Sequence, residues 1–120
     1  MAKNILVVDK TSFNRAMIKN NLSKAGYNII AEAGDGRTAI EQFIIHSPDL
    51  VVMEAQLPEV DGIEALKAMR KISPDAPVIM CSAAGQQTMV LEAVNAGAKD
   101  FLVKPIKPDR LIDAVKGCIG

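Results

Sequence analysis

Polar residues that can bind or carry a phosphoryl group follow several short apolar runs of this sequence. Asp9 and Lys10 follow the first run, Glu54 the third and Ser82 the fourth, and Lys104 closes the fifth. A carboxylate can act as the nucleophile toward a phosphoryl group, and a second carboxylate can help to hold Mg²⁺. A hydroxyl and an ammonium can hold phosphoryl oxygens. Brought to one cleft, these residues resemble a phosphate or metal–phosphate site.

Two alternating patterns predict the elements that must position these residues. Five apolar runs are short and mostly β-branched, which is typical of parallel strands buried on both faces: Ile5–Val8, Asn28–Ala31, Leu50–Met53, Val78–Cys81 and Phe101–Val103. The stretches between and after these runs carry apolar residues at helical spacing. The first four helices are expected to end before Gly26, Pro48, Pro74 and Gly97, and the fifth to begin near Pro108.

Strands that alternate with helices predict an α/β fold of the (βα)5 kind, in a single domain over residues 1–120. A length of 120 residues suits one domain. Crossover helices make the strands parallel and cover both faces of the sheet. A closed eight-fold barrel needs about twice this length, so we expect an open, doubly wound, five-stranded sheet of the flavodoxin-like type. In such a sheet the site is expected where the carboxyl ends of the strands meet.

The composition excludes several classes of function. Lys plus Arg number 14 and Asp plus Glu number 14, so the formal net charge is zero, and neither nucleic-acid binding nor a basic membrane-binding face is expected. Cys81 and Cys118 lie far apart without CxxC spacing, which argues against a disulfide framework and a zinc site. No signal peptide and no run of about 18 apolar residues is found. We therefore expect a cytoplasmic protein.

The segments at the predicted strand ends carry a family resemblance. They are, in chain order, Val7–Asp9, Leu57–Gly62, Ser82–Ala83, Gly97–Phe101 and Lys104–Pro105. With them the chain resembles the receiver domain of two-component response regulators over essentially its whole length. Among these domains it is similar to the stand-alone chemotaxis proteins of the CheY type. The resemblance implies the strand order 2-1-3-4-5 and a place in phosphorelay signal transduction.

The resemblance assigns the phosphoacceptor role to position 54 and metal-site roles to Asp9, position 10 and Gln56. Two positions depart from the family pattern, because Glu54 and Lys10 stand where the family has aspartates. The extra methylene of Glu54 moves its carboxylate outward by roughly 1–1.5 Å, and a misplacement of about 1 Å can cost about a hundredfold in rate. Lys10 removes a Mg²⁺ ligand and repels the ion. No cofactor is expected, and Mg²⁺ is expected only if the site remains functional.

These departures leave alternatives open. Lys10 is expected to form an ion pair with Glu54 or Asp9 and so to take over part of the charge of the metal. Glu54 is either a weak mimic of the phosphorylated state or an inert replacement. Alternatively, Asp9 and Lys10 are exposed loop residues without a role in a site.

The resemblance also assigns roles in the phosphoryl pocket and in switching. Ser82 and Lys104 match the residues that contact the phosphoryl group, and Phe101 matches the aromatic switch residue. The peptide bond before Pro105 is expected to be cis, as in relatives. Plainer interpretations stand beside these roles: Ser82 as a cap of the fourth helix or a loop hydroxyl, Lys104 as a counter-ion to the two acids, and Phe101 as partly buried packing.

Three functions follow from these observations. The first is a phosphorylation-independent receiver that acts by protein–protein binding and is not an enzyme. The resemblance implies that the partner is a histidine kinase or a target such as the flagellar motor switch. The partner would bind the face formed by the fourth helix, fifth strand and fifth helix. The resemblance also implies that the chain is a monomer or a weak dimer. The alternative is a working phosphoacceptor that uses Glu54. A flavodoxin-like enzyme or nucleotide binder has the least support, because neither GxGxxG nor GxxxxGK[ST] occurs.

Overall fold

Strands and helices alternate along the whole of the computed structural model, which describes residues 2–120. The strands are β1 (Asn4–Val8), β2 (Asn28–Ala33), β3 (Leu50–Glu54), β4 (Val78–Ala83) and β5 (Asp100–Lys104). The helices are α1 (Ser12–Lys24), α2 (Gly36–His46), α3 (Gly62–Ile72), α4 (Gln87–Asn95) and α5 (Pro108–Ile119). Each helix therefore ends, or begins, close to the glycine or proline that predicts it. None of these helices is both long enough and apolar enough to cross a membrane.

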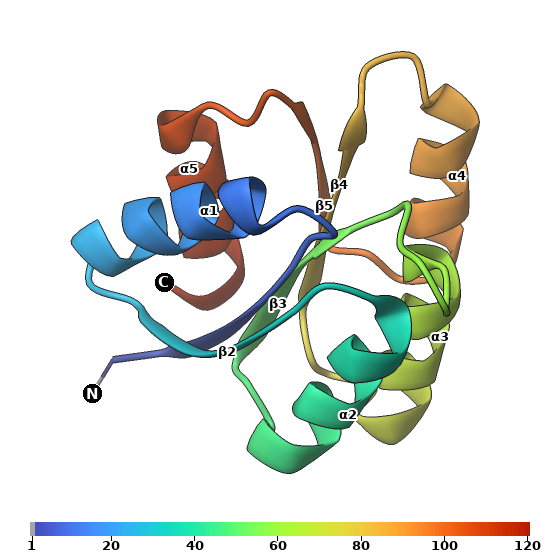
Figure 1. The fold of residues 1–120 in the computed structure, drawn as a ribbon, viewed down its shortest axis with the longest axis horizontal. Helices are drawn as coiled ribbons and strands as arrows, with labels where there is room; N and C mark the ends of the chain where they lie inside the picture. The colour runs from blue at the N-terminus through green and yellow to red at the C-terminus, as the bar shows by residue number, and fades with distance from the viewer. Residues whose placement is uncertain (1) are drawn as a thin grey trace.

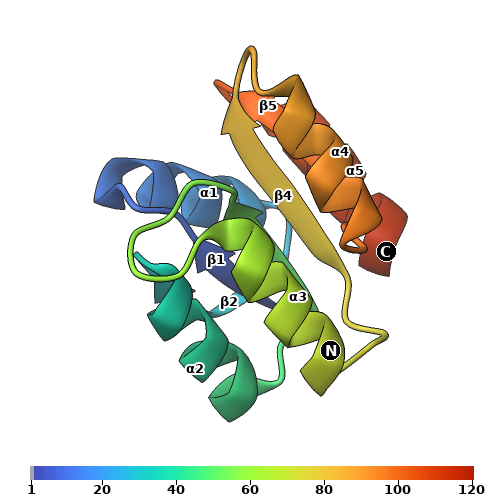
Figure 2. The same ribbon diagram turned by 90° about the vertical axis from the view of Figure 1, so that its right-hand side faces the viewer.

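The five strands form one parallel sheet with the order β2-β1-β3-β4-β5. The predicted α/β fold and its strand order are confirmed. Helices α1 and α5 cover one face of the sheet, and α2, α3 and α4 cover the other (Figure 1). Figure 2 shows α2 and α3 side by side on the second face, with α4 beyond α3. The strand order reverses between β1 and β3, so a cleft at the carboxyl ends of these two strands is the expected location of a site.

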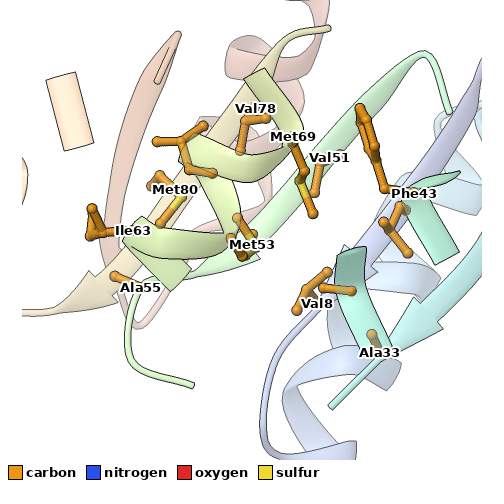
Figure 3. Packing of buried hydrophobic residues seen from close by; sticks show 14 of the residues in the cluster. Val8, Ala33, Phe43, Val51, Met53, Ala55, Ile63, Met69, Val78 and Met80 are labelled. Carbon is orange, nitrogen blue, oxygen red and sulfur yellow. The ribbon is translucent and has the colours of Figure 1, made fainter. Parts of the chain in front are cut away.

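The core lies in two layers, one on each face of the sheet. Successive strand residues point to opposite faces, so Val8 and Met53 enter the layer beneath α2, α3 and α4 (Figure 3). Their neighbours Val7 and Val52 enter the layer beneath α1 and α5. This two-sided burial explains why the strands appear in the sequence as continuous apolar runs.

All five strands extend further than the sequence predicts, because parallel pairing continues past the apolar runs. Val8 at the end of β1 still pairs with Ala33 of β2, and Ser82 of β4 still pairs with Val103 of β5. Ser82 therefore lies inside β4 and not in the loop that follows it. The buried strand end holds its hydroxyl in a fixed position.

Two close backbone approaches place the loop between β3 and α3. A Cβ atom on Gly36 would lie 1.7 Å from the carbonyl oxygen of Val60, so α2 can begin against this loop only with glycine at that position. A Cβ atom on Gly62 would lie 2.3 Å from the carbonyl oxygen of Glu54. Asp61 caps α3 by accepting a hydrogen bond from the backbone N–H of Ile63 at 3.3 Å. The start of α3 is thereby fixed directly against the end of β3.

Candidate functional site

Five residues at the carboxyl edge of the sheet form a cluster that we call the rim site: Asp9, Lys10, Glu54, Ser82 and Lys104. Asp9 directly follows β1, and Glu54 and Lys104 are the last residues of β3 and β5. Asp9 is only 1% exposed and Glu54 only 6% exposed. Two acids from neighbouring strands are therefore buried beside each other, which requires a positive partner.

Lys104 provides that positive partner to both acids. Its Nζ donates a hydrogen bond to Asp9 Oδ2 at 2.7 Å and to Glu54 Oε2 at 2.8 Å. Because β4 lies between β3 and β5, the Lys104 side chain reaches across the end of β4. A charge-assisted contact to each acid offsets the cost of burying them. Lys104 is therefore placed as the counter-ion of both acids. The peptide bond between Lys104 and Pro105 is cis.

The remaining oxygen of Asp9 is held by the first turn of α1. Asp9 Oδ1 accepts hydrogen bonds from the backbone N–H of Thr11 at 2.9 Å, from the Thr11 hydroxyl at 3.1 Å and from Asn14 Nδ2 at 3.5 Å. Arg15 Nη1 donates to the Asp9 carbonyl oxygen at 2.6 Å. The interpretation of Asp9 as an exposed loop residue is therefore wrong. Sequence analysis missed these three partners, although Thr11 stands at the N-cap position that precedes a helix.

Glu54 has two contacts with Lys10, one through the backbone and one through the side chain. The Lys10 backbone N–H donates to Glu54 Oε1 at 2.9 Å. The Lys10 ammonium lies 3.7 Å from Glu54 Oε2, the oxygen that Lys104 also binds, and the Lys10 side chain is 46% exposed. Of the two acids considered as partners of Lys10, Glu54 is the one it pairs with. Both oxygens of Glu54 are thus occupied by protein donors.

Ser82 makes its side-chain hydrogen bond to α4 and not to either acid. Its hydroxyl, in a residue that is 2% exposed, donates to Met89 Sδ of α4 at 3.7 Å. The interpretation of Ser82 as a cap of α4 is wrong, because Gln86 occupies the N-cap position. Phe101 is half-buried and packs against the core layer that contains Met53 and Met80.

A shallow depression of about 420 Å³ opens beside the rim site. It is lined by Lys10, Gln56, Leu57, Asp61 and Met89. The Gln56 side chain is exposed, so this residue faces solvent next to the rim. The depression gives a solute access to Lys10 and Met89, whereas Asp9 and Glu54 lie below the surface.

The bridge that Lys104 forms between the two acids shifts the pKa values of Asp9 and Lys104. Burial alone raises the pKa of Asp9, but hydrogen bonds from Lys104 and Thr11 outweigh burial and lower that pKa from its ordinary value. Burial alone lowers the pKa of Lys104, but Asp9 and Glu54 outweigh burial and raise that pKa. Both shifts favour the charged forms. The bridge is therefore an ion pair at neutral pH.

Comparisons with known proteins agree with this architecture. The sequence profile of the response regulator receiver domain matches residues 5–116. The chain is 52% identical over 115 residues to the chemotaxis protein CheY of Bacillus subtilis, with 96% of each chain covered. It is 49% identical over 115 residues to CheY of Thermotoga maritima, again with 96% of each chain covered.

Solved structures give the same result. A chain of the CheX–CheY–BeF3–Mg²⁺ complex from Borrelia burgdorferi superposes with a TM-score of 0.91 at 32% identity, covering 96% of this chain and 87% of that one. A response regulator structure from Chloroflexus aurantiacus superposes with a TM-score of 0.93 at 29% identity, covering 98% of each chain. The chain belongs to the response regulator receiver domain family and is a receiver of the CheY type in two-component signalling.

Proposed function

We propose that this chain is a CheY-type receiver that acts by binding other proteins and takes up no phosphoryl group at residue 54. One observation carries the proposal. Lys104 bridges the carboxylates of Asp9 and Glu54, and the Lys10 ammonium lies 3.7 Å from the same Glu54 oxygen that Lys104 binds. Both acids are thus neutralised by lysines of the chain itself.

The rim site does not fit a Mg²⁺ ion. Mg²⁺ requires a near-octahedral set of oxygen ligands and loses its waters reluctantly. Position 10, to which the family resemblance gives a second acid, carries an ammonium. Within residues 2–120, no three His, Cys, Asp or Glu side chains are grouped as ligands of a metal. Two carboxylates and two ammonium groups cancel in formal charge, so the rim offers little attraction to a divalent cation.

The position of the Glu54 carboxylate also argues against phosphoryl transfer. Its Oε1 accepts from the Lys10 backbone N–H and its Oε2 accepts from Lys104. Each of these two contacts fixes one oxygen of the Glu54 carboxylate. In-line transfer depends on placement within about 1 Å, and the extra methylene of Glu54 displaces its carboxylate by roughly 1–1.5 Å from where an aspartate would hold it.

Protein binding is supported by the family and by exposed apolar residues. CheY-like receivers interact with kinases and other target proteins, and the Borrelia burgdorferi structure is a complex of CheX with CheY. In this chain Leu91 and Val94 of α4 and Val103 of β5 are exposed, and α4 packs beside β5. We place the binding surface on the α4–β5–α5 face, with a histidine kinase or a motor-switch protein as partner.

Intact-mass spectrometry after incubation with Mg²⁺ and acetyl phosphate tests the proposal. The wild-type protein is expected to keep its mass. The double variant Lys10→Asp/Glu54→Asp is expected to gain about 80 Da, the mass of one phosphoryl group, because it regains both acids. The two single variants show which substitution matters more.

The alternative is a working phosphoacceptor, which the retention of Asp9, Ser82 and Lys104 favours. A gain of about 80 Da in the wild-type protein that disappears in Glu54→Gln would establish it. If both the wild type and the double variant keep their original mass, a feature outside the rim site blocks phosphoryl transfer. The explanation based on Lys10 and Glu54 is then wrong.

A further inference from the structure

Met89 connects the depression to the buried rim, because the residue lines the depression and its sulfur contacts Ser82. Its Sδ accepts the hydrogen bond from the buried Ser82 hydroxyl at 3.7 Å. The same side chain lines the depression together with Lys10 and Gln56. It also packs against the core layer beneath α3 and α4. A small solute in the depression therefore lies beside a residue whose sulfur accepts a hydrogen bond from the rim site.

The other methionines of the described chain do not combine these properties. Met53, Met69 and Met80 are 0% exposed and lie inside the core (Figure 3). Met17 on α1 is half-buried and lines an apolar groove with Phe13, but none of the hydrogen bonds formed by residues 2–120 ends on its sulfur. Met17 is therefore a matched control for accessibility without the contact to Ser82.

Oxidation would change the character of this contact. A thioether is a weak hydrogen-bond acceptor, whereas a sulfoxide is polar and presents a strong acceptor oxygen.

In the reaction with hydrogen peroxide, the sulfur lone pair attacks one peroxide oxygen and the O–O bond breaks. The sulfur loses two electrons and keeps that oxygen. The second oxygen leaves as water with both peroxide protons.

We propose that Met89 is a peroxide-responsive modification site, and that its sulfoxide holds the Ser82 hydroxyl toward α4. The new oxygen sits beside a hydroxyl that already points at the sulfur, so Ser82 exchanges a weak acceptor for a strong one. Lys10, a cation, lines the same depression. The reagent for this site is a small hydroperoxide, and reduction of the methionine sulfoxide reverses the oxidation.

The modification also loosens the packing of α4. Met89 packs against apolar residues of the core layer, and a polar oxygen is costly to place there unless it is hydrogen-bonded. The oxidised side chain therefore satisfies its oxygen at Ser82, and α4 shifts relative to β4 to make room for the added oxygen. Oxidation of Met89 goes beyond the proposed function, because it acts on Ser82 and α4 whether or not residue 54 accepts a phosphoryl group.

The test combines peptide mapping with NMR on the full chain. The protein is treated with dilute hydrogen peroxide, and the gain of about 16 Da for each oxygen is assigned to individual methionines. We expect oxidation at Met89 while Met53, Met69 and Met80 remain unoxidised. We also expect the backbone amide signals of Ser82 and α4 to shift, and to return after treatment with methionine sulfoxide reductases.

Three variants make the test specific. Met89→Leu conserves volume and is expected to fold normally, and it should lose the shift at Ser82. Met17→Leu should keep the shift. In Ser82→Ala, oxidation of Met89 should perturb the neighbouring amides less than in the wild type. The proposal is overturned if Met89 oxidises no faster than the three buried methionines. It is equally overturned if the Ser82 amide signal stays in place when Met89 is oxidised, or if Met89→Leu still shows the shift.

Discussion

The ammonium of Lys104 lies 2.7 Å from a carboxylate oxygen of Asp9, although 95 positions separate the two residues in the chain. The same ammonium binds Glu54 at 2.8 Å. One cation thus joins the ends of β1, β3 and β5. Because both acids are buried, this contact decides how the rim site responds to substitution and to pH.

Replacing Lys104 with methionine should destabilise the protein strongly. The change keeps most of the side-chain volume but leaves the buried Asp9 without a cation and Glu54 with only the half-exposed Lys10, for which a loss of roughly 3–5 kcal/mol in the free energy of unfolding is expected. Urea denaturation measures this loss. Lys67→Met is the control, because Lys67 pairs with Glu64 on the exposed surface of α3 and should cost less than about 1 kcal/mol. Similar costs for the two variants would contradict a stabilising bridge.

Acid should destabilise the wild type through Asp9. The pKa of Asp9 is lowered in the folded state, because hydrogen bonds from Lys104 and Thr11 outweigh burial, which alone would raise it. The unfolded chain therefore binds the proton first. The contribution of Asp9 is fully present above the unfolded pKa of about 3.9 and is lost as the pH falls through the lower folded pKa. Urea denaturation between neutral pH and pH 3 should show a smaller loss of stability in Asp9→Asn than in the wild type; equal losses would assign the acid sensitivity to other groups.

Two glycine-to-alanine substitutions should act in opposite directions. In Gly36→Ala the added Cβ meets the Val60 carbonyl oxygen at 1.7 Å, so the loop before α3 must move, at a cost of roughly 1–3 kcal/mol. Gly117 lies within α5 with no atom within 4 Å of an added Cβ, and Gly117→Ala should stabilise the helix by about 0.5–1 kcal/mol. Thermal unfolding of both variants provides the comparison. A stable Gly36→Ala would show that the loop is free to shift.

The two cysteines should differ in reactivity. Burial raises the pKa of the Cys81 thiol to about 12, so almost no thiolate is present at neutral pH. Cys118 is half-buried near the end of α5. A colourimetric thiol reagent should modify Cys118 in the folded protein, and Cys118→Ser should abolish this labelling until the chain is unfolded. Rapid labelling of Cys118→Ser under native conditions would indicate that β4 opens readily.

The sequence predicts the fold, and the meeting of the strand-end residues Asp9, Glu54 and Lys104 at one edge of the sheet, for a physical reason. Strands buried on both faces must be apolar at consecutive positions, so the first polar residue after each run marks a strand end, as at Asp9 and Glu54. Parallel strands then bring these ends to one edge. The strand order came from the family resemblance and not from the pattern itself.

The contacts within the site could not be predicted in the same way. Which of two lysines bridges the acids depends on side-chain reach across β4, and no sequence spacing encodes that reach. The sequence places Ser82 after its strand because polarity marks the end of an apolar run, although backbone pairing continues to Ala83. The hydrogen bond from Ser82 to Met89 depends on the packing of α4 against the sheet, which helical periodicity does not specify.

The bridge at Lys104 also has a consequence for the edge of the sheet. β5 pairs only with β4 among residues 2–120, so its outer side presents unpaired backbone groups. Asp100 at the start of this strand is bound by Arg110 of α5 at 2.9 Å and 3.2 Å, and Lys104 at its end is tied to the interior. An edge strand held at both ends by charged residues is a poor template for another chain. Loss of the bridge would therefore expose the protein to strand addition and aggregation even where its fold survives.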